Sequence, residues 1–158
     1  PKDVQKDCFQ KQLQLAKNHH LPVIIHTRDA EDDTLAILKE FSYPSILIHC
    51  FTGTYEFAKK CWDLGYFTSF SGIVSFKSAI ELQKVVKDCP DELYLIETDA
   101  PFLAPIPHRG KTNQPSYVKH VAQAIAQIKN ISLEDVIKQS TSNFERFFFT
   151  QFNKSITF

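Results

Sequence analysis

Three short apolar runs in this chain each end on a side chain that can bind a metal ion. LPVIIH ends at His26, SILIHC reaches His49, and LYLIETD ends at Asp99. In parallel α/β sheets and barrels, functional side chains lie where the strands stop, at the carboxyl edge of the sheet. Two imidazoles and one carboxylate at such an edge predict a divalent metal centre, although a single histidine in this position is more often a hydrogen-bonded core residue.

The chemistry expected of these residues is hydrolysis by activated water. We expect one or two ions of Mg²⁺, Mn²⁺ or Zn²⁺, which lower the pKa of bound water and offset charge on a phosphoryl oxygen. Mixed imidazole and carboxylate ligands suit Zn²⁺ or Mn²⁺ more than Ca²⁺. Asp99 is the expected catalytic residue, because a metal-held carboxylate stays ionised and can accept the water proton. Glu97 shares the strand face of Asp99, and either supports a metal ligand or pairs with a cation.

Substrate contacts are expected from cationic and amide side chains close to these ligands. Arg28 follows His26, and a proline-rich loop after Asp99 carries Arg109 and Asn113. Arginine binds phosphate oxygens in pairs, which favours a phosphate substrate. The alternative is that Arg28 is only a surface or helix-capping cation and that the loop merely connects two elements.

Two further histidines near this loop are weaker candidates. His108 stands beside Arg109 in the proline-rich loop, where it could contact substrate. His120 falls in a predicted helix, where we expect a solvated side chain.

The elements that must position these residues alternate regularly along the chain. Apolar spacing and capping residues predict helices, and short apolar runs rich in β-branched residues predict strands. Asp29, Thr54 and Ser132 are the expected helix caps. The predicted strands cover residues 21–26, 45–50, 66–72 and 93–99, and the predicted helices cover residues 3–18, 30–41, 54–65, 78–87, 115–129, a segment starting near 132, and 143–149.

Strand and helix alternation at this spacing predicts an α/β fold with a parallel sheet. The strand centres are about 22–26 residues apart, the length of one βα unit. The strands are nearly continuous in apolar character, as expected when helices cover a parallel sheet. Four such units form only half of an eightfold barrel, which needs about 250 residues. We therefore expect a (β/α) TIM-barrel type fold with about the last four βα units, spanning residues 1–149, followed by a tail at 150–158.

Composition narrows the possible partners. The 158 residues are 43% hydrophobic and 23% charged, with a formal net charge of +0. A neutral chain has no overall field that attracts polyanions, so binding of nucleic acid would depend on local cations. No run approaches the roughly 18 apolar residues of a membrane span. We expect a cytoplasmic protein, or a nuclear one in a eukaryote, with no membrane partner.

Five motifs in this order resemble the TatD family of metal-dependent deoxyribonucleases, which belongs to the amidohydrolase-like barrels. The motifs are IIHTRDA (24–30), IHCFTG (48–53), SFSGIVSFK (69–77), ETDAPFLAP (97–105) and RGKTNQP (109–115). The resemblance implies that His26 and His49 are metal ligands on the fifth and sixth barrel strands. It implies that Asp99, at the end of the eighth strand, binds metal and orients or deprotonates water. The family's H-x-H pair and its Glu on the first and fourth strands have no counterpart in this sequence.

The resemblance implies hydrolysis of phosphodiester bonds in DNA, as an exonuclease, by the complete enzyme. This chain alone, without the other ligands, is expected to be inactive. Related folds cleave ester, amide or aminoacyl-tRNA linkages with the same chemistry, and such a substrate is the first alternative. The second is a non-catalytic half-barrel that docks with its missing N-terminal half or associates with itself through open sheet edges.

Overall fold

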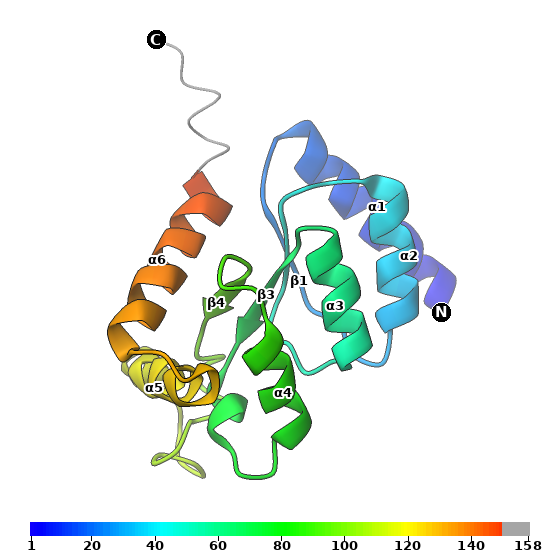
Figure 1. Cartoon of the computed structure of the whole chain (residues 1–158). Coiled ribbons are helices and arrows are strands. Elements are labelled where there is room, and N and C mark those ends of the chain that lie inside the picture. Colours follow the sequence, from blue (N-terminus) through cyan, green and yellow to red (C-terminus); the bar gives the residue numbers. More distant parts are fainter. Residues whose placement is uncertain (150–158) are drawn as a thin grey trace.

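The computed structural model describes residues 1–149, so the predicted tail at 150–158 lies outside the described residues. Helices and strands alternate along this range, as the sequence predicts (Figure 1). The strands are β1 (Val23–Ile25), β2 (Ile46–Ile48), β3 (Phe67–Phe70) and β4 (Tyr94–Ile96). The helices are α1 (Lys2–Asn18), α2 (Glu31–Phe41), α3 (Tyr55–Asp63), α4 (Ile80–Asp88), α5 (Val118–Lys129) and α6 (Leu133–Phe149), with short 3₁₀ helices η1 (Gly72–Ser75) and η2 (Pro115–Tyr117).

The four strands form one parallel sheet in the order β1-β2-β3-β4, so neighbours in the chain are neighbours in the sheet. Each connection passes through a helix, which is the repeated βα arrangement of a barrel wall. Helices that follow one another also pack together, as α1 with α2, α3 with α4, and α5 with α6 (Figure 1). The predicted α/β class and parallel sheet are confirmed.

The two faces of the sheet have different surroundings. One face contributes Ile25, Ile46 and Ile48 to the large core formed with the helices. The opposite face carries a smaller cluster of Leu47, Phe67, Leu95 and Phe147, the last of which comes from α6. Since side chains alternate between faces along a strand, residues two positions beyond this smaller cluster lie on the same face. The site described below lies there.

The predicted helix boundaries are correct with three exceptions. The cap predicted at Asp29 is wrong, because α2 begins after Ala30, which provides no side-chain cap. The helix expected to begin at Pro115 is a 3₁₀ turn first, and α5 starts at Val118. The two final helices are a single one, α6, since nothing between residues 132 and 149 breaks the helical pattern.

Two predicted caps are confirmed. Thr54 Oγ1 accepts a hydrogen bond from the Phe57 amide at 3.2 Å, which starts α3. Ser132 Oγ accepts from the Asp135 amide at 3.0 Å and donates to the Asp135 carboxylate at 2.7 Å, which starts α6. Both bonds satisfy amide groups that the first helical turn leaves unpaired.

No helix within residues 1–149 is both long enough and apolar enough to cross a lipid bilayer.

Candidate metal centre

Three potential ligands converge at the carboxyl edge of the sheet. His49 Nε2 lies 3.5 Å from Asp99 Oδ1, and His49 Nδ1 lies 2.9 Å from Glu97 Oε1. Ligand atoms of these three side chains all lie within 4.8 Å of one another, and each side chain is partly exposed. Two ligands on one tetrahedral Zn²⁺ at 2.0–2.1 Å are about 3.3 Å apart. The His49 and Asp99 atoms therefore fit a shared ion with little movement.

Glu97 contacts the ring nitrogen of His49 that does not face Asp99. Its Oε1 atom accepts hydrogen bonds from the Cys50 amide at 2.8 Å and from the Ser69 hydroxyl. The same oxygen faces His49 Nδ1, so it favours the tautomer with the proton on Nδ1 and the lone pair on Nε2. That lone pair faces Asp99. Because Oε1 already has three donors, Glu97 fits a supporting partner better than a direct ligand.

Strand alternation explains why these residues meet. His49 lies two positions beyond Leu47, Ser69 two beyond Phe67, and Glu97 two beyond Leu95, so all three follow the smaller cluster on the same face of the sheet. Ser69 was not identified from the sequence. The signal was available, because serine is unusual in a strand of aromatic residues.

The chain bends sharply where it leaves the strands at the site. Cys50 and Asp99 both have left-handed backbone conformations, with φ of 46° and 55°. Such conformations are uncommon for residues other than glycine and recur at functional sites. At Asp99 the bend comes shortly after β4, which ends at Ile96, and places the carboxylate beside His49.

The Cys50 thiol borders the same site. Burial raises the pKa of this thiol to about 11, although a hydrogen bond to Ser71 opposes the shift. Its Sγ atom lies 3.2 Å from Ser71 Oγ. The thiol is therefore protonated at neutral pH and contributes no negative charge beside the two carboxylates.

His26 lies next to this group without joining it. Its ring centre is 6.2 Å from that of His49, and its side chain is exposed at the end of β1. Within residues 1–149, the group of ligand atoms within 4.8 Å contains His49, Glu97 and Asp99 but not His26. Because His26 is exposed, a change of rotamer toward the group disrupts little packing. Its predicted role as a ligand stays a prediction.

The two arginines proposed for substrate binding are both exposed. The Arg28 guanidinium lies 3.9 Å from the Asp29 carboxylate, and both side chains are almost fully solvated, so this pair adds little stability. Arg109 lies over the Phe76 ring with its guanidinium carbon 4.3 Å from the ring centre. Stacking on Phe76 holds Arg109 in place while its N–H groups remain accessible.

Asn113 has a different position from the one expected. Its side chain is only 4% exposed. Its amide donates to the carbonyls of Thr98 and Phe102 at 2.7 and 2.6 Å, and its oxygen accepts from the Gln114 amide at 2.9 Å. These bonds hold the loop beside Asp99. The expected substrate contact is thus without support, because the polar atoms of Asn113 are already used inside the chain.

The proline-rich loop rests on η1. A Cβ atom on Gly72 would lie 1.9 Å from the Leu103 carbonyl oxygen, so glycine permits the close approach of two backbones. The Ile106 amide donates to Ser75 Oγ at 2.9 Å. These contacts place the loop over the end of β4, next to Asp99.

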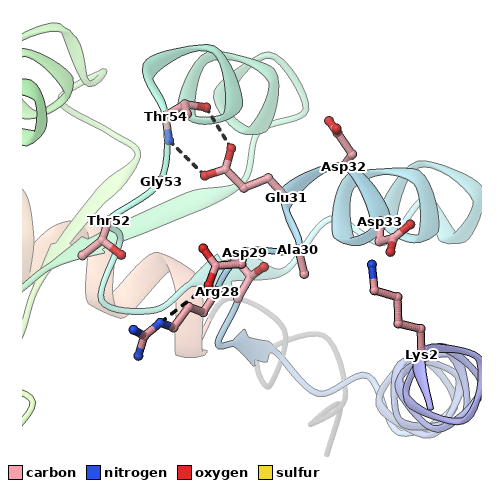
Figure 2. Close-up of a pocket in the computed structure, with 11 residues that line it drawn as sticks. Lys2, Arg28, Asp29, Ala30, Glu31, Asp32, Asp33, Thr52, Gly53 and Thr54 are labelled. Carbon is pink, nitrogen blue, oxygen red and sulfur yellow. Dashed lines mark hydrogen bonds and ion pairs between the residues drawn. The ribbon is translucent and has the colours of Figure 1, made fainter.

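A pocket of about 530 Å³ opens where the loops after β1 and β2 meet (Figure 2). Figure 2 shows Glu31 between these loops, where its carboxylate accepts from the Thr54 amide at 3.0 Å and from the Thr54 hydroxyl at 2.8 Å. Arg28 and Lys2 also line the pocket, together with the acidic residues Asp29, Glu31, Asp32 and Asp33.

Curated relatives match most of this chain. It is 47% identical to an uncharacterized metal-dependent hydrolase, YabD, of Bacillus subtilis, over 94% of the chain and 59% of that protein. It is 44% identical to the uncharacterized metal-dependent hydrolase YcfH of Escherichia coli K12, over 91% of the chain and 55% of that protein. The chain therefore spans somewhat more than half the length of these relatives.

Solved structures also match most of this chain. A TatD homologue from Escherichia coli K12, YjjV, has a TM-score of 0.87 at 26% identity, over 92% of this chain and 57% of that one. A TatD family hydrolase from Entamoeba histolytica has a TM-score of 0.83 at 24% identity, over 94% and 58%, and supports the fold alone. The family model described as TatD related DNase matches residues 1–149. The match covers nearly the whole chain, and His49 faces Asp99 at the carboxyl edge of the sheet. The chain therefore belongs to the TatD family.

Proposed function

We propose that this chain is the C-terminal portion of a TatD-type metal-dependent hydrolase that cleaves phosphodiester bonds in DNA. The observation that carries the proposal is His49, held by Glu97 at Nδ1 and facing Asp99 at Nε2. His49 and Asp99 would hold the ion together with His26. When bound, a divalent ion lowers the pKa of water and offsets charge on a phosphoryl oxygen.

The side chains of this site have distinct proposed roles. Asp99 accepts the proton of the attacking water, since it stands beside the proposed ion and is partly exposed to solvent. Glu97 fixes the orientation of His49. Arg28 and Arg109 bind the phosphate through their exposed guanidinium groups.

The proposal that further βα units complete the barrel has its own support. Within residues 1–149 the sheet has four strands, whereas a closed barrel of this type has eight. The relatives are longer than the region that matches this chain. Ile24, on the same face as His26, is 54% exposed, so the apolar face of the sheet is open at β1. We propose that the rest of the barrel covers this face and provides the remaining ligands.

The substrate can be tested with the full-length protein that contains this chain. We expect release of nucleotides from single-stranded DNA that requires a divalent ion and is lost in Asp99→Asn. Lys87→Ala, a change at an exposed residue of α4, is the matched control and should leave the rate unchanged. An enzyme that binds the ion but releases no nucleotide from DNA would reject the substrate, while the metal centre would stand.

The isolated chain tests the half-barrel proposal. Open sheet edges are prone to pair with other chains, so we expect the 158-residue chain to associate with itself and to be inactive. Sedimentation would measure its state of association. A chain that sediments as a monomer and is active would contradict both proposals, that the sheet has an open edge and that further ligands are needed.

A second substrate class is favoured by one observation. Four carboxylates line the pocket after β1 and β2, and they oppose binding of a polyanion there. A small ester or amide without phosphate groups would avoid this repulsion, whereas an aminoacyl-tRNA, itself a polyanion, would not. A substrate panel that includes such compounds decides between the classes, because only a nuclease should lose activity when Arg28 and Arg109 are replaced by alanine.

A further inference from the structure

Two histidines meet outside the proposed metal centre. His108 belongs to the loop after β4, and His120 lies in the first turn of α5. Their Nε2 atoms are 3.2 Å apart. The sequence suggested a substrate contact for the first and a solvated side chain for the second, but the structure pairs them, because η2 turns the chain back toward the loop.

Both rings are held in place by neighbours. The His108 ring stacks on Tyr117 with ring centres 3.9 Å apart and planes 3° from parallel. His120 Nδ1 lies 2.9 Å from Gln123 Oε1. Since an amide oxygen only accepts, His120 carries its proton on Nδ1. Its Nε2 lone pair therefore faces His108, whose Nε2–H donates to it.

We propose that His108 and His120 form a second metal site, which takes a Zn²⁺ ion between their Nε2 atoms and ties the loop to α5. Two nitrogens at 2.0–2.1 Å from a tetrahedral Zn²⁺ are about 3.3 Å apart, close to the separation already present. On binding, the proton on His108 Nε2 is replaced by one on Nδ1, so the imidazole stays neutral and both lone pairs face the ion.

Two lysines, Lys111 and Lys119, lie close enough to His108 to act on it electrostatically. The two lysines repel a cation. Both are exposed, so water and salt screen that repulsion, and binding should strengthen as ionic strength rises.

Space for the remaining ligands of the ion lies beside His120. A cavity of about 420 Å³ there is bordered by Pro107, Gln123 and Gln127 and opens to solvent. Water molecules would have to fill the positions that the two histidines leave open, and the glutamine side-chain oxygens can accept hydrogen bonds from them.

The site has a consequence for the loop over the proposed catalytic centre. This loop carries Arg109 and is anchored near its end by Asn113. A bridge between His108 and His120 would add a second anchor on α5. The loop should then open less often, which hydrogen exchange at residues 106–112 would register as slower exchange when Zn²⁺ is present.

The test separates this site from the proposed catalytic centre. The full chain with His49→Ala and Asp99→Asn lacks two ligands of that centre, and we expect it still to bind one Zn²⁺ ion in calorimetric titration. Adding His108→Ala or His120→Ala should weaken this binding at least tenfold. The double variant His19→Ala and His20→Ala, at the exposed end of α1, removes two histidines elsewhere and should leave it unchanged.

Unchanged Zn²⁺ affinity in both the His108 and the His120 variants would overturn the proposal. Circular dichroism shows whether each variant is folded. If one is not, the unmodified chain provides a second measurement, because Zn²⁺ should shift the ring proton resonances of His108 and His120 together at the same ratio of metal to protein. Absence of that joint shift would also overturn it.

Discussion

Replacement of Glu97 by glutamine tests how the proposed metal centre is held together. Glutamine keeps the size and one oxygen acceptor, so the Cys50 amide can retain its partner. What is lost is the negative charge beside His49 Nδ1. That charge strengthens the hydrogen bond and favours the tautomer with a free Nε2 lone pair.

The magnitude follows from the role of Glu97 behind a metal ligand. Loss of such a partner weakens metal binding about 10–100-fold. This corresponds to about 1.4–2.8 kcal/mol of binding free energy. The change in the free energy of unfolding should be smaller than for Glu97→Leu. That variant leaves the buried Ser69 hydroxyl without an acceptor, at about 1–3 kcal/mol, and leaves the Cys50 amide with Ser69 Oγ as its remaining partner.

The assay is calorimetric titration of the protein with Mn²⁺ or Zn²⁺, alongside nitrogen NMR of the His49 ring. Zn²⁺ is titrated in the His120→Ala background, so that the second proposed site does not contribute. Glu81→Gln, an exposed glutamate paired with Lys84 on α4, is the matched control. Unchanged metal affinity in Glu97→Gln would refute the reasoning. So would a complete loss equal to that of Asp99→Asn, since it would make Glu97 a direct ligand.

Further predictions concern the fold around the site. Thr54→Ala should lower the free energy of unfolding by about 1 kcal/mol in denaturant titration, because α3 loses its cap, and Thr54→Ser should restore most of it. Gly72→Ala should destabilise by about 1–3 kcal/mol, because its Cβ would meet the Leu103 carbonyl. Burial raises the pKa of Cys61 to about 12, so alkylation at pH 8 followed by mass spectrometry should modify the exposed Cys8 far faster. For the same reason the stability contribution of Cys61 should fall as pH rises from about 9 toward 12, since the unfolded chain releases its proton first.

Each of these predictions has a clear contrary result. Equal stability of the Thr54 variants would show that the cap contributes nothing. Normal stability of Gly72→Ala would show that the loop can move away from η1 at no cost. Rapid alkylation of Cys61 in the native protein would show that it is accessible.

Much of the fold could be predicted because periodicity is local. The alternation of short apolar runs with helical patterns led to four strands in one parallel sheet, and each run ends close to the observed strand end. The caps at Thr54 and Ser132 were predictable for the same reason, since a cap needs only its own helix. Asp29 failed as a cap because its left-handed backbone, with φ of 53°, belongs to the turn before α2.

The site could be predicted only in part. Strand ends pointed to His49 and Asp99, which the structure brings to 3.5 Å. They also pointed to His26, which stays an exposed neighbour of the group. Asn113 was assigned to substrate from its place in a loop, whereas its hydrogen bonds run inward. Whether a polar side chain faces inward or outward depends on contacts from distant parts of the chain.

The amino-acid sequence by itself determined the order of the elements, the family and the residue types at the carboxyl edge, because all of these depend on patterns within a few turns or one strand. Only the tertiary structure decided which side chains form hydrogen bonds with one another. Glu97 accepts hydrogen bonds from a residue of β3 and from a residue after β2. The rings of His108 and His120 are hydrogen-bonded to each other, although they lie in different elements. Such contacts depend on strand register and on loop packing, and both arise only when distant segments of the chain come together.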